Sequence, residues 1–396
     1  MSAPVNILVS GSSIAGPAAA YWLHRAGHQV TVIERSPRPR LAGQNVDVRG
    51  AGRQVLRMMN LEDSVLQRNT GEIGVRFVDD DDRVFLELPA GQSDDSGATA
   101  EMEVLRGELS AVLLDALPED VTVHFGRRIT GLLDDTDSAR VTFDDGTEQN
   151  YDLVVVAEGT RSSTRQLIFG DVPTRPLGLY VAFGTIPRSA ADDKWWYWYN
   201  ATGGRSVNVR PDNKGTTRVS LSFLSPPMGY EDCTVDEQKA LLAETFSDLG
   251  WRVPHIVEAL QSSDELYVDN LTQVRARDYA RGRVVLLGDA AWGPTPISGR
   301  GATLALTGAY LLAGELGRNA SVDAALRAYQ EAMSEFVSKA QHLPPGAPRL
   351  AHPTTRLELS LFRALLRIAG STPVRTVARL LPERPPRDRQ LIRYDD

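Results

Sequence analysis

A glycine-rich turn close to the N-terminus is the first place where residue types and spacing indicate chemistry. Residues 11–16 read Gly-Ser-Ser-Ile-Ala-Gly. This is the G-x-G-x-x-G pattern of dinucleotide-binding turns, except that Ser13 replaces the second glycine. Serine is small, so the backbone can still approach a pyrophosphate, and a helix behind the turn would offer N–H groups and partial positive charge. Glu34 ends the next apolar segment, where an acid can accept hydrogen bonds from an adenosine ribose. The turn predicts a dinucleotide site, with a purely structural turn as the alternative, and does not by itself separate FAD from NAD.

A second turn, far along the chain, favours FAD. The stretch Gly288-Asp289-Ala290-Ala291 follows a buried apolar segment, and Pro296, Gly299 and Gly301 lead from it into a helical pattern. An acid at a strand end followed by a glycine-rich helix start provides a polar anchor and further N–H donors. Because the first turn already takes the adenosine end, this second site suits the ribityl and ring end of a longer cofactor. Simple NAD-binding domains of the Rossmann type have no such element.

The elements that must position these turns alternate as in an α/β protein. Residues 5–10, 17–26 and 29–34 are predicted as strand, helix and strand, which form a βαβ unit. A helix is predicted over 301–316, directly after the second turn. Between 173 and 274 the segments are short, aromatic or β-branched, and separated by Gly, Asn or Pro, which predicts a largely antiparallel sheet.

We therefore predict an α/β fold in which a Rossmann-like domain is interrupted by a mostly antiparallel β-sheet domain and followed by C-terminal helices. The sheet domain is expected to bind the substrate. The predicted parts are the first half of the nucleotide domain (1–172, with 73–100 as a candidate contribution to the substrate side), the sheet domain (173–274), the second half of the nucleotide domain (275–345) and a C-terminal helical segment (346–396).

Composition excludes several other classes of protein. The chain has 396 residues, 42% apolar and 24% charged, which is ordinary for a globular protein of two domains. A net charge of −8 argues against nucleic-acid binding, and no apolar run approaches the ~20 residues that span a bilayer. Cys233 is the one cysteine, which excludes an internal disulfide and is compatible with the cytoplasm. His24 and His28 have no third ligand nearby, so no metal site is expected.

The run Trp-Trp-Tyr-Trp-Tyr at residues 195–199 is the most unusual local composition. On a strand, Trp196 and Trp198 share one face, and the other three aromatic residues share the opposite face. One face must meet the domain core, and the other can stack on a flat polycyclic substrate. Burial of both faces in packing is the alternative. The candidate substrate contacts are Trp196, Trp198, Asn208, Arg210, Phe223 and Trp292.

Three motifs in order along the chain resemble those of the class A flavoprotein aromatic hydroxylases, which have the p-hydroxybenzoate hydroxylase fold. They are the turn at 11–16 with Glu34-Arg35, the stretch 152–165 (DLVVVAEGTRSSTR), and the turn at 288–291 (GDAA). The resemblance covers essentially the whole chain, and the short length resembles the tetracycline-inactivating and polyketide-tailoring branch. Glu158 stands where the family usually has Asp, and Trp292 where it usually has His. An aromatic residue at 292 can line the flavin side of the cavity or cap the core.

The resemblance implies a non-covalently bound FAD and a set of residues that contact it. Arg106 is similar to the family's flavin-contacting arginine, and Arg49 resembles another arginine near the isoalloxazine. The implied cofactor-binding residues are Gly11, Ser13, Ile14, Ala15, Gly16, Glu34, Arg35, Arg49, Arg106, Glu158, Asp289, Pro296, Gly299, Gly301 and Ala302.

The resemblance also implies the reaction. NADPH or NADH reduces FAD, the reduced flavin captures O2 as a C4a-hydroperoxide, and one oxygen atom passes to an aromatic or polyketide-like small molecule. Oxygen insertion of the Baeyer–Villiger type on the same fold and a non-catalytic flavin- or ligand-binding protein are the alternatives. The sequence singles out no catalytic residue. A cytoplasmic monomer or homodimer, acting without a membrane or nucleic acid, is expected.

Overall fold

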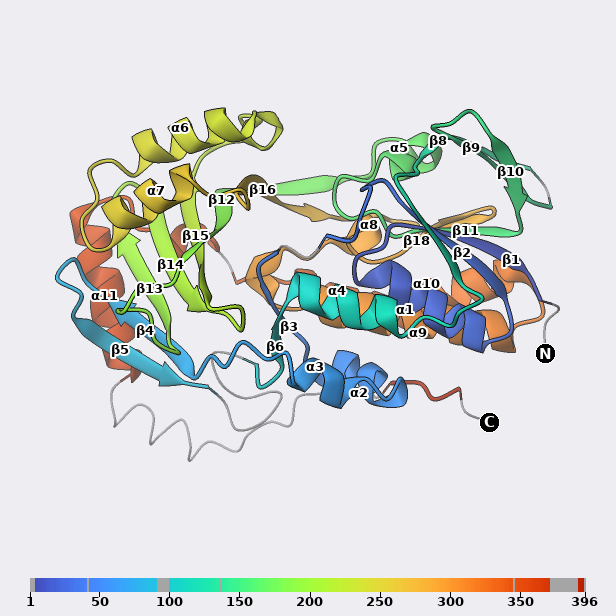
Figure 1. Ribbon diagram of the computed structural model, residues 1–396, viewed down its shortest axis with the longest axis horizontal. Helices are drawn as coiled ribbons and strands as arrows, with labels where there is room; N and C mark the ends of the chain where they lie inside the picture. The colour runs from blue at the N-terminus through green and yellow to red at the C-terminus, as the bar shows by residue number, and fades with distance from the viewer. Residues whose placement is uncertain are drawn as a thin grey trace.

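Two lobes lie side by side in the computed structural model, which describes residues 4–40, 43–90, 100–135, 137–344, 346–370 and 391–394 (Figure 1). We call them the parallel lobe, built on a six-stranded sheet, and the antiparallel lobe, built on a seven-stranded sheet. The predicted parts 73–100 and 346–396 each include residues outside this description, namely 91–99 and most of 371–396. None of the described helices is long and apolar enough to cross a membrane.

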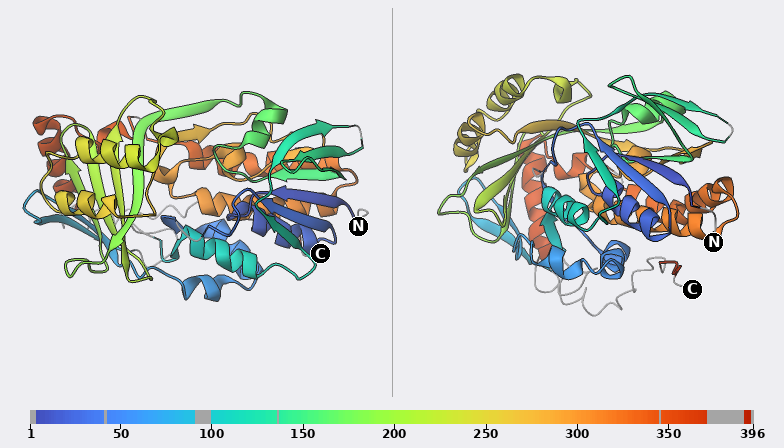
Figure 2. Two further views of the ribbon diagram at one scale, coloured as in Figure 1. Left: turned by 45° about the horizontal axis from the view of Figure 1, so that its top comes forward. Right: turned by 45° about the vertical axis from the view of Figure 1, so that its right-hand side comes forward.

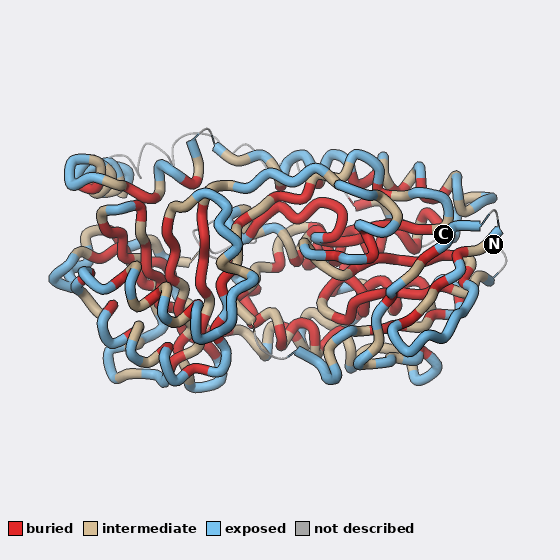
Figure 3. The backbone as a smooth tube through the Cα atoms, turned by 90° about the horizontal axis from the view of Figure 1, so that it is seen from above, coloured by how far each residue is buried: buried red, intermediate tan, exposed pale blue. Residues whose placement is uncertain are grey.

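The parallel lobe is built around the βαβ unit that the sequence predicts. Its sheet has the order β17-β18-β11-β1-β2-β7, in which all neighbours run parallel except the β17–β18 pair. Both faces are covered, which explains the unbroken apolar strands (Figure 3). The strands are β1 (Asn6–Ser10), β2 (Gln29–Glu34), β7 (Thr122–Phe125), β11 (Leu153–Val156), β17 (Ala280–Arg281) and β18 (Val284–Leu286).

Helices cover one face of this sheet, and a small sheet with α5 covers the other (Figure 1). The helices of the first face are α1 (Ala15–Arg25), α4 (Arg106–Asp115), α9 (Gly301–Arg318) and α10 (Val322–Gln341). The second face carries α5 (Ser163–Phe169) and the antiparallel strands β8 (Ile129–Asp134), β9 (Ala139–Phe143) and β10 (Glu148–Tyr151). Short elements of this lobe are β3 (Asn45–Asp47), β6 (Glu103–Leu105), α2 (Gly50–Met58), α3 (Glu62–Leu66), α8 (Asp289–Trp292) and η2 (Pro296–Ser298).

The antiparallel lobe has the strand order β16-β12-β15-β14-β13-β4-β5. The last two strands at one end of this order, β4 and β5, come from residues 74–89. Strand β4 pairs in parallel with β13. The strands are β4 (Gly74–Val78), β5 (Val84–Pro89), β12 (Thr174–Pro187), β13 (Trp196–Ala201), β14 (Arg205–Pro211), β15 (Thr216–Leu224) and β16 (Tyr267–Val274).

The two faces of this sheet have different neighbours. Helices α6 (Val235–Thr245) and α7 (Val253–Gln261) pack on one face, where Tyr197, Tyr199 and Leu221 contribute to a separate apolar core. The other face is partly covered by the C-terminal segment: α11 (Arg356–Gly370) packs against β5, and Asn200 on β13 donates to the Ala351 carbonyl of η3 (Arg349–Ala351). Figure 2 shows this lobe from two further sides.

The helical stretch between Gly50 and Leu66 is divided into α2 and α3, because Asn60 adopts a φ of 57°, a left-handed conformation that asparagine tolerates better than most residues. The end of the described chain returns to the parallel lobe, where the Tyr394 hydroxyl donates to Glu315 Oε1 on α9 at 2.6 Å.

Candidate active site

The two glycine-containing turns meet at the carboxyl ends of neighbouring strands. Strands β1, β11 and β18 are adjacent and parallel, so the turns after β1 and β18 emerge at the same sheet edge. Gly11 has a φ of 110°, and a Cβ there would collide with the carbonyl of Ala157 after β11. A Cβ on Gly288 would lie 3.0 Å from the Cβ of Ala15. Glycine at both positions therefore allows the turns to approach each other closely.

The N-terminus of α1 is free to bind an anion. No side chain caps it, and no acid lies in its first turn. Ser110 Oγ lies 3.2 Å from the carbonyl oxygens of both Ser12 and Ser13 and fixes the turn from behind. Ser13 is half-buried and Gly16 is fully packed, because a Cβ on Gly16 would collide with the Gly11 carbonyl. The turn therefore has the small residues and the donors that a pyrophosphate requires.

Glu34 stands at the end of β2, beside this turn. Its carboxylate accepts from the backbone N–H of Ser12 at 3.0 Å and of Ser36 at 2.9 Å. These bonds hold the acid half-buried at the sheet edge, with Arg35 exposed next to it. This is the position that the sequence assigns to the ribose-binding acid.

Asp289 begins α8 at the same edge. Its side chain is exposed to solvent, although many protein atoms surround the carboxyl group. Burial raises the pKa of Asp289, and the positive charge of Arg106 opposes that shift. Arg106 also interacts electrostatically with Tyr267 of the antiparallel lobe. The arginine that resembles the family's flavin contact thus lies between the two lobes, within reach of the predicted anchor for the ribityl end.

The loop before α9 approaches the second predicted arginine. Arg49 donates to Asp47 Oδ2 at 3.0 Å, and its backbone N–H donates to Thr303 Oγ1 at 3.0 Å. A Cβ on Gly299 would lie 3.4 Å from the same Asp47 oxygen. Thr295 adopts a φ of 80°, and its buried hydroxyl has no hydrogen-bond partner within the described chain. Strained backbone of this kind is concentrated at functional sites.

Three further predicted cofactor contacts lie at or before the start of α9, namely Pro296, Gly301 and Ala302. Ala302 is buried. A Cβ on Gly301 would lie 3.9 Å from Asp289 Oδ1. The loop therefore runs past both Asp47 and Asp289. Free helix N–H groups, an open carboxylate and an unpartnered hydroxyl along one sheet edge fit a long, polar dinucleotide such as FAD.

The carboxylate of Glu158 connects two elements of the parallel lobe through hydrogen bonds. Its carboxylate accepts from the hydroxyls of Ser10, Ser162 and Thr164, each at 2.6 Å, and from the Thr164 N–H at 3.1 Å. These bonds join the end of β1 to the start of α5. Arg165 extends the connection by donating to the carbonyl of Ala290 at 3.0 Å. The middle motif therefore fastens the two cofactor turns to each other.

The open face of the antiparallel sheet brings together four of the predicted substrate contacts. Trp196 and Trp198 stack with ring centroids 5.1 Å apart. Trp196 Nε1 donates to Asn208 Oδ1 at 2.8 Å, and the Arg210 guanidinium lies 4.1 Å from the Trp196 ring. Trp198 also packs with Phe77 and belongs to an apolar cluster at the sheet edge, so part of this face is core.

Two predicted substrate contacts lie in the core instead. Phe223 packs with Tyr180, Tyr230 and Phe246 under α6, because the open face at this point of β15 belongs to its neighbour Ser222. Trp292 is 1% exposed, with its ring 5.0 Å from that of Tyr279 and 6.2 Å from that of Tyr329. Trp292 therefore caps the core of the parallel lobe, the second of its two alternatives, and the proposed contact of Phe223 is corrected.

The structure adds residues from β16 that the sequence did not single out. Tyr267 donates to Gln44 Oε1 at 2.5 Å across the lobes and lines a recess of about 210 Å³. Burial raises its pKa to about 12. Burial also raises the pKa of Asp269, which interacts with Asp289 of the other lobe. Spacing alone could not have found these residues, because nothing in the local pattern marks β16 as a lobe contact.

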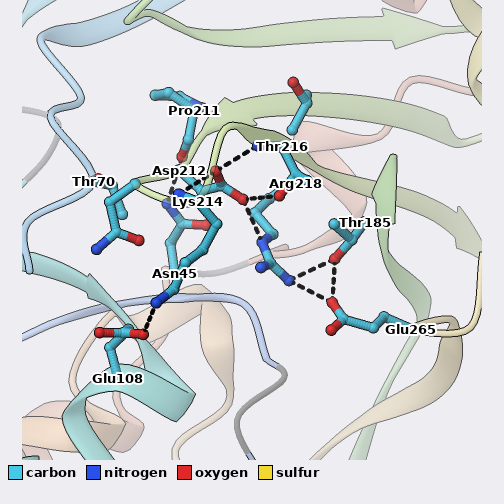
Figure 4. Close-up of polar contacts among 12 residues, drawn as sticks. Asn45, Thr70, Glu108, Thr185, Pro211, Asp212, Lys214, Thr216, Arg218 and Glu265 are labelled. Atoms are coloured by element: carbon cyan, nitrogen blue, oxygen red, sulfur yellow. Dashed lines mark hydrogen bonds and ion pairs between the residues drawn. The ribbon is translucent and has the colours of Figure 1, made fainter. Parts of the chain in front are cut away.

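The hairpin between β14 and β15 fastens the lobes near this recess (Figure 4). Asp212 accepts from Arg218 Nε at 3.0 Å and from the backbone of the turn, and Arg218 reaches Glu265 at 2.9 Å. The Lys214 ammonium pairs with Glu108 on α4 of the parallel lobe. The Lys214–Glu108 ion pair therefore connects the tip of this hairpin to the parallel lobe.

The comparisons with known proteins agree with this geometry. A family model described as "FAD binding domain" matches residues 4–342. The chain is 33% identical to the FAD-dependent monooxygenase asL4 of Sarocladium schorii, over 80% of this chain and 76% of the relative. It is 34% identical to a flavin-dependent monooxygenase from an unknown prokaryotic organism, over 85% of this chain and 87% of that protein.

The fold has a solved counterpart of similar size. The crystal structure of tetracycline destructase Tet(55) superimposes with a TM-score of 0.78 at 29% identity and covers 93% of this chain and 98% of that one. The resemblance to class A flavoprotein hydroxylases is thereby confirmed, as is the predicted α/β fold. The chain belongs to the FAD-binding domain family and is an FAD-dependent monooxygenase.

Proposed function

We propose that this monooxygenase uses NADPH or NADH and inserts one oxygen atom of O2 into an aromatic or polyketide-like ring compound. The observation that carries the proposal is the aromatic sheet face. Trp196, with Asn208 and Arg210 beside it, projects from the antiparallel lobe on the face away from α6 and α7, and the two lobes are joined around it by side-chain contacts. An indole face beside hydrogen-bonding groups suits a flat, oxygenated ring system.

The chain's residues would hold FAD along the edge formed by β1, β11 and β18. The α1 N-terminus would bind the pyrophosphate, Glu34 the adenosine ribose, and Asp289 the ribityl hydroxyls. Arg49 and Arg106 would face the ring end. When bound, FAD supplies the redox chemistry that activates O2, and the protein orients the partners and excludes water.

The substrate class follows from what the sheet face offers. The stacked indoles provide flat apolar area, the Asn208 amide accepts from the Trp196 indole N–H, and the Arg210 guanidinium lies over the Trp196 ring. A planar ring that carries hydroxyl or carbonyl groups can satisfy both at once. The names of the relatives, monooxygenases and a tetracycline destructase, support the same class of compound.

The test is a screen of polycyclic phenols and tetracyclines for stimulated NADPH and NADH oxidation by the FAD-loaded enzyme. Each product would be identified by mass and NMR, because hydroxylation and Baeyer–Villiger insertion both add one oxygen atom and only NMR separates them. We expect oxygenated product to form in step with nicotinamide consumption. Flavin reduction that no ring compound accelerates, with hydrogen peroxide as the only product, would contradict the proposed substrate class.

A further inference from the structure

A cluster of buried charged side chains, Arg210 with Glu72 and Glu103, packs against the Trp196 ring. Arg210 on β14 donates from Nε to Glu72 Oε2 at 2.9 Å and from a terminal nitrogen to Glu103 Oε2 at 2.5 Å. Both glutamate side chains are 1% exposed. Glu72 precedes β4 and Glu103 lies on β6, so the cluster joins the antiparallel lobe to the parallel lobe.

The charges of this cluster do not balance. Two carboxylates and one guanidinium give a net charge of −1, and both carboxylates are almost fully buried. The neighbouring Asp47–Arg49 ion pair adds one charge of each sign, and burial and the charge of Glu103 raise the pKa of Asp47, so this pair does not supply the missing positive charge. An unbalanced buried charge is expensive, and binding of one proton removes it. The two carboxylates also meet at one donor, because Arg210 Nη2 donates to Glu72 Oε1 at 3.3 Å and to Glu103 Oε2 at 2.5 Å.

The hydrogen bonds show which carboxyl carries the proton. Glu103 accepts from Asn45 Nδ2 at 2.5 Å and from the Thr70 hydroxyl at 2.9 Å, in addition to Arg210. Both oxygens of Glu103 therefore accept hydrogen bonds from other side chains. Among the described residues, the side chain of Glu72 accepts only from Arg210, and burial raises the pKa of Glu72 well above its usual range. The proton is therefore expected on Glu72.

We propose that Glu72 and Glu103 together hold one proton at neutral pH, and that this proton sets the charge of the Arg210–Trp196 wall of the substrate cavity. With the proton bound the wall is neutral, and without it the wall carries an extra negative charge beside any ring oxygen of the substrate. Both glutamates are positioning residues that act through Arg210. The effect on the substrate rests on the proposed function, whereas the bound proton does not.

Infrared spectroscopy of the FAD-loaded protein at pH 7 tests the proton directly. The wild type should show a protonated carboxyl band that shifts on labelling of glutamate with ¹³C. The same band should disappear in both Glu72→Gln and Glu103→Gln, because either change removes the shared proton. The exposed Glu244→Gln variant should retain it. A wild type without this band, or a band that either glutamine variant keeps, would overturn the proposal.

The pH dependence of unfolding gives a second test that needs no substrate. Because the folded pKa of Glu72 is raised, the folded state keeps a proton that the unfolded state loses above the usual pKa of glutamate. The folding equilibrium constant of the wild type should therefore fall by up to tenfold per pH unit from that pKa up to the folded pKa of the pair, and level off above it. Glu72→Gln should lack this component, and Glu244→Gln should keep it. Identical profiles for Glu72→Gln and the wild type would show that no proton is held.

The consequence for the substrate is measured with a phenol that stimulates NADPH oxidation. In the wild type, KM should rise as pH passes the folded pKa of the pair, with kcat changed much less. In Glu72→Gln, which imitates the protonated acid, KM should stay constant across that range. If the infrared band is present and no phenol is turned over, the proposed function fails and the shared proton stands. If turnover occurs and KM of the two proteins changes alike with pH, the role of the proton at the cavity wall fails.

Discussion

Asp289 is the residue whose replacement should separate cofactor binding from folding most cleanly. Its side chain is exposed and makes no ion pair among the described residues, so its removal should leave the surrounding packing intact. Losing a charged acceptor costs about 1.5–3 kcal/mol. Asp289→Ala should therefore bind FAD about 10- to 150-fold more weakly in flavin-fluorescence titrations. Exposed Asp278→Ala is the control, and unchanged affinity in a folded Asp289→Ala would show that this acid only begins a helix.

The two tryptophans of the open sheet face should respond differently. Both pack against the apolar cluster around Phe77, but Trp196 also contacts Arg210 and Asn208, whereas Trp198 stacks directly on Phe77. Trp196→Ala should mainly raise KM at unchanged FAD content, and Trp198→Ala should mainly lower the melting temperature. Phe223→Ala is the matched core control, with a loss of about 3–5 kcal/mol and a normal KM. Equal stability losses with normal KM in both tryptophan variants would assign the whole run to packing.

The sequence could place some of these residues because a strand alternates. The spacing of two puts Trp196, Trp198, Asn208 and Arg210 on one face, as the structure has them. Phe223 is out of phase with these residues, because Arg218 and Ser220 are the residues of β15 that pair with Arg210 and Asn208 and Phe223 faces the opposite side. Trp292 lies on a helix of four residues, which is too short for its sequence to show which residues face the core.

Among the elements, the connection between β1 and α5 depends on one side chain. Glu158 accepts four hydrogen bonds there. Since a bond to a charged group contributes about 1.5–3 kcal/mol, Glu158→Ala should lower the free energy of unfolding by roughly 3 kcal/mol or more in chemical denaturation. Exposed Glu119→Ala should change it by less than about 0.5 kcal/mol. A Glu158→Ala variant of normal stability with weakened FAD binding would instead make this acid a cofactor contact.

Whether a segment forms a helix or a strand was easier to predict from the sequence than which other segments it pairs with or packs against. The βαβ unit and the strands from 179 to 224 have periods that local sequence reveals. The break at Asn60 depends on one left-handed residue, and the pairing of β4 with β13 joins segments more than a hundred residues apart. The central role of Tyr267 and Asp269 depends on that long-range assembly, so no local pattern contains it.

At the scale of the whole molecule, the end of the chain is fastened to the parallel lobe. Leu391 is buried there, and the Tyr394 ring fills the space that a side chain at Gly314 on α9 would need. Gly314→Ala should therefore destabilise the protein, although alanine favours a helix by about 1 kcal/mol over glycine. In a Tyr394→Ala background the same change should stabilise it. A double-mutant cycle measured by thermal unfolding compares the effect of Gly314→Ala with and without the Tyr394 ring. Additive effects of the two substitutions would show that Tyr394 does not occupy the space beside Gly314.

The strand order of the parallel lobe has a consequence for how the protein is made. Strand β18 joins β11 only after all of β12–β16 has been synthesised, so the Asp289 turn and the loop to Ala302 are the last parts of the cofactor edge to leave the ribosome. Until then β11 has an unpaired edge, and such edges recruit other chains. Assembly of the FAD site therefore follows synthesis of about three-quarters of the chain. We expect the nascent protein to be most prone to aggregation during the interval in which its antiparallel lobe is being translated.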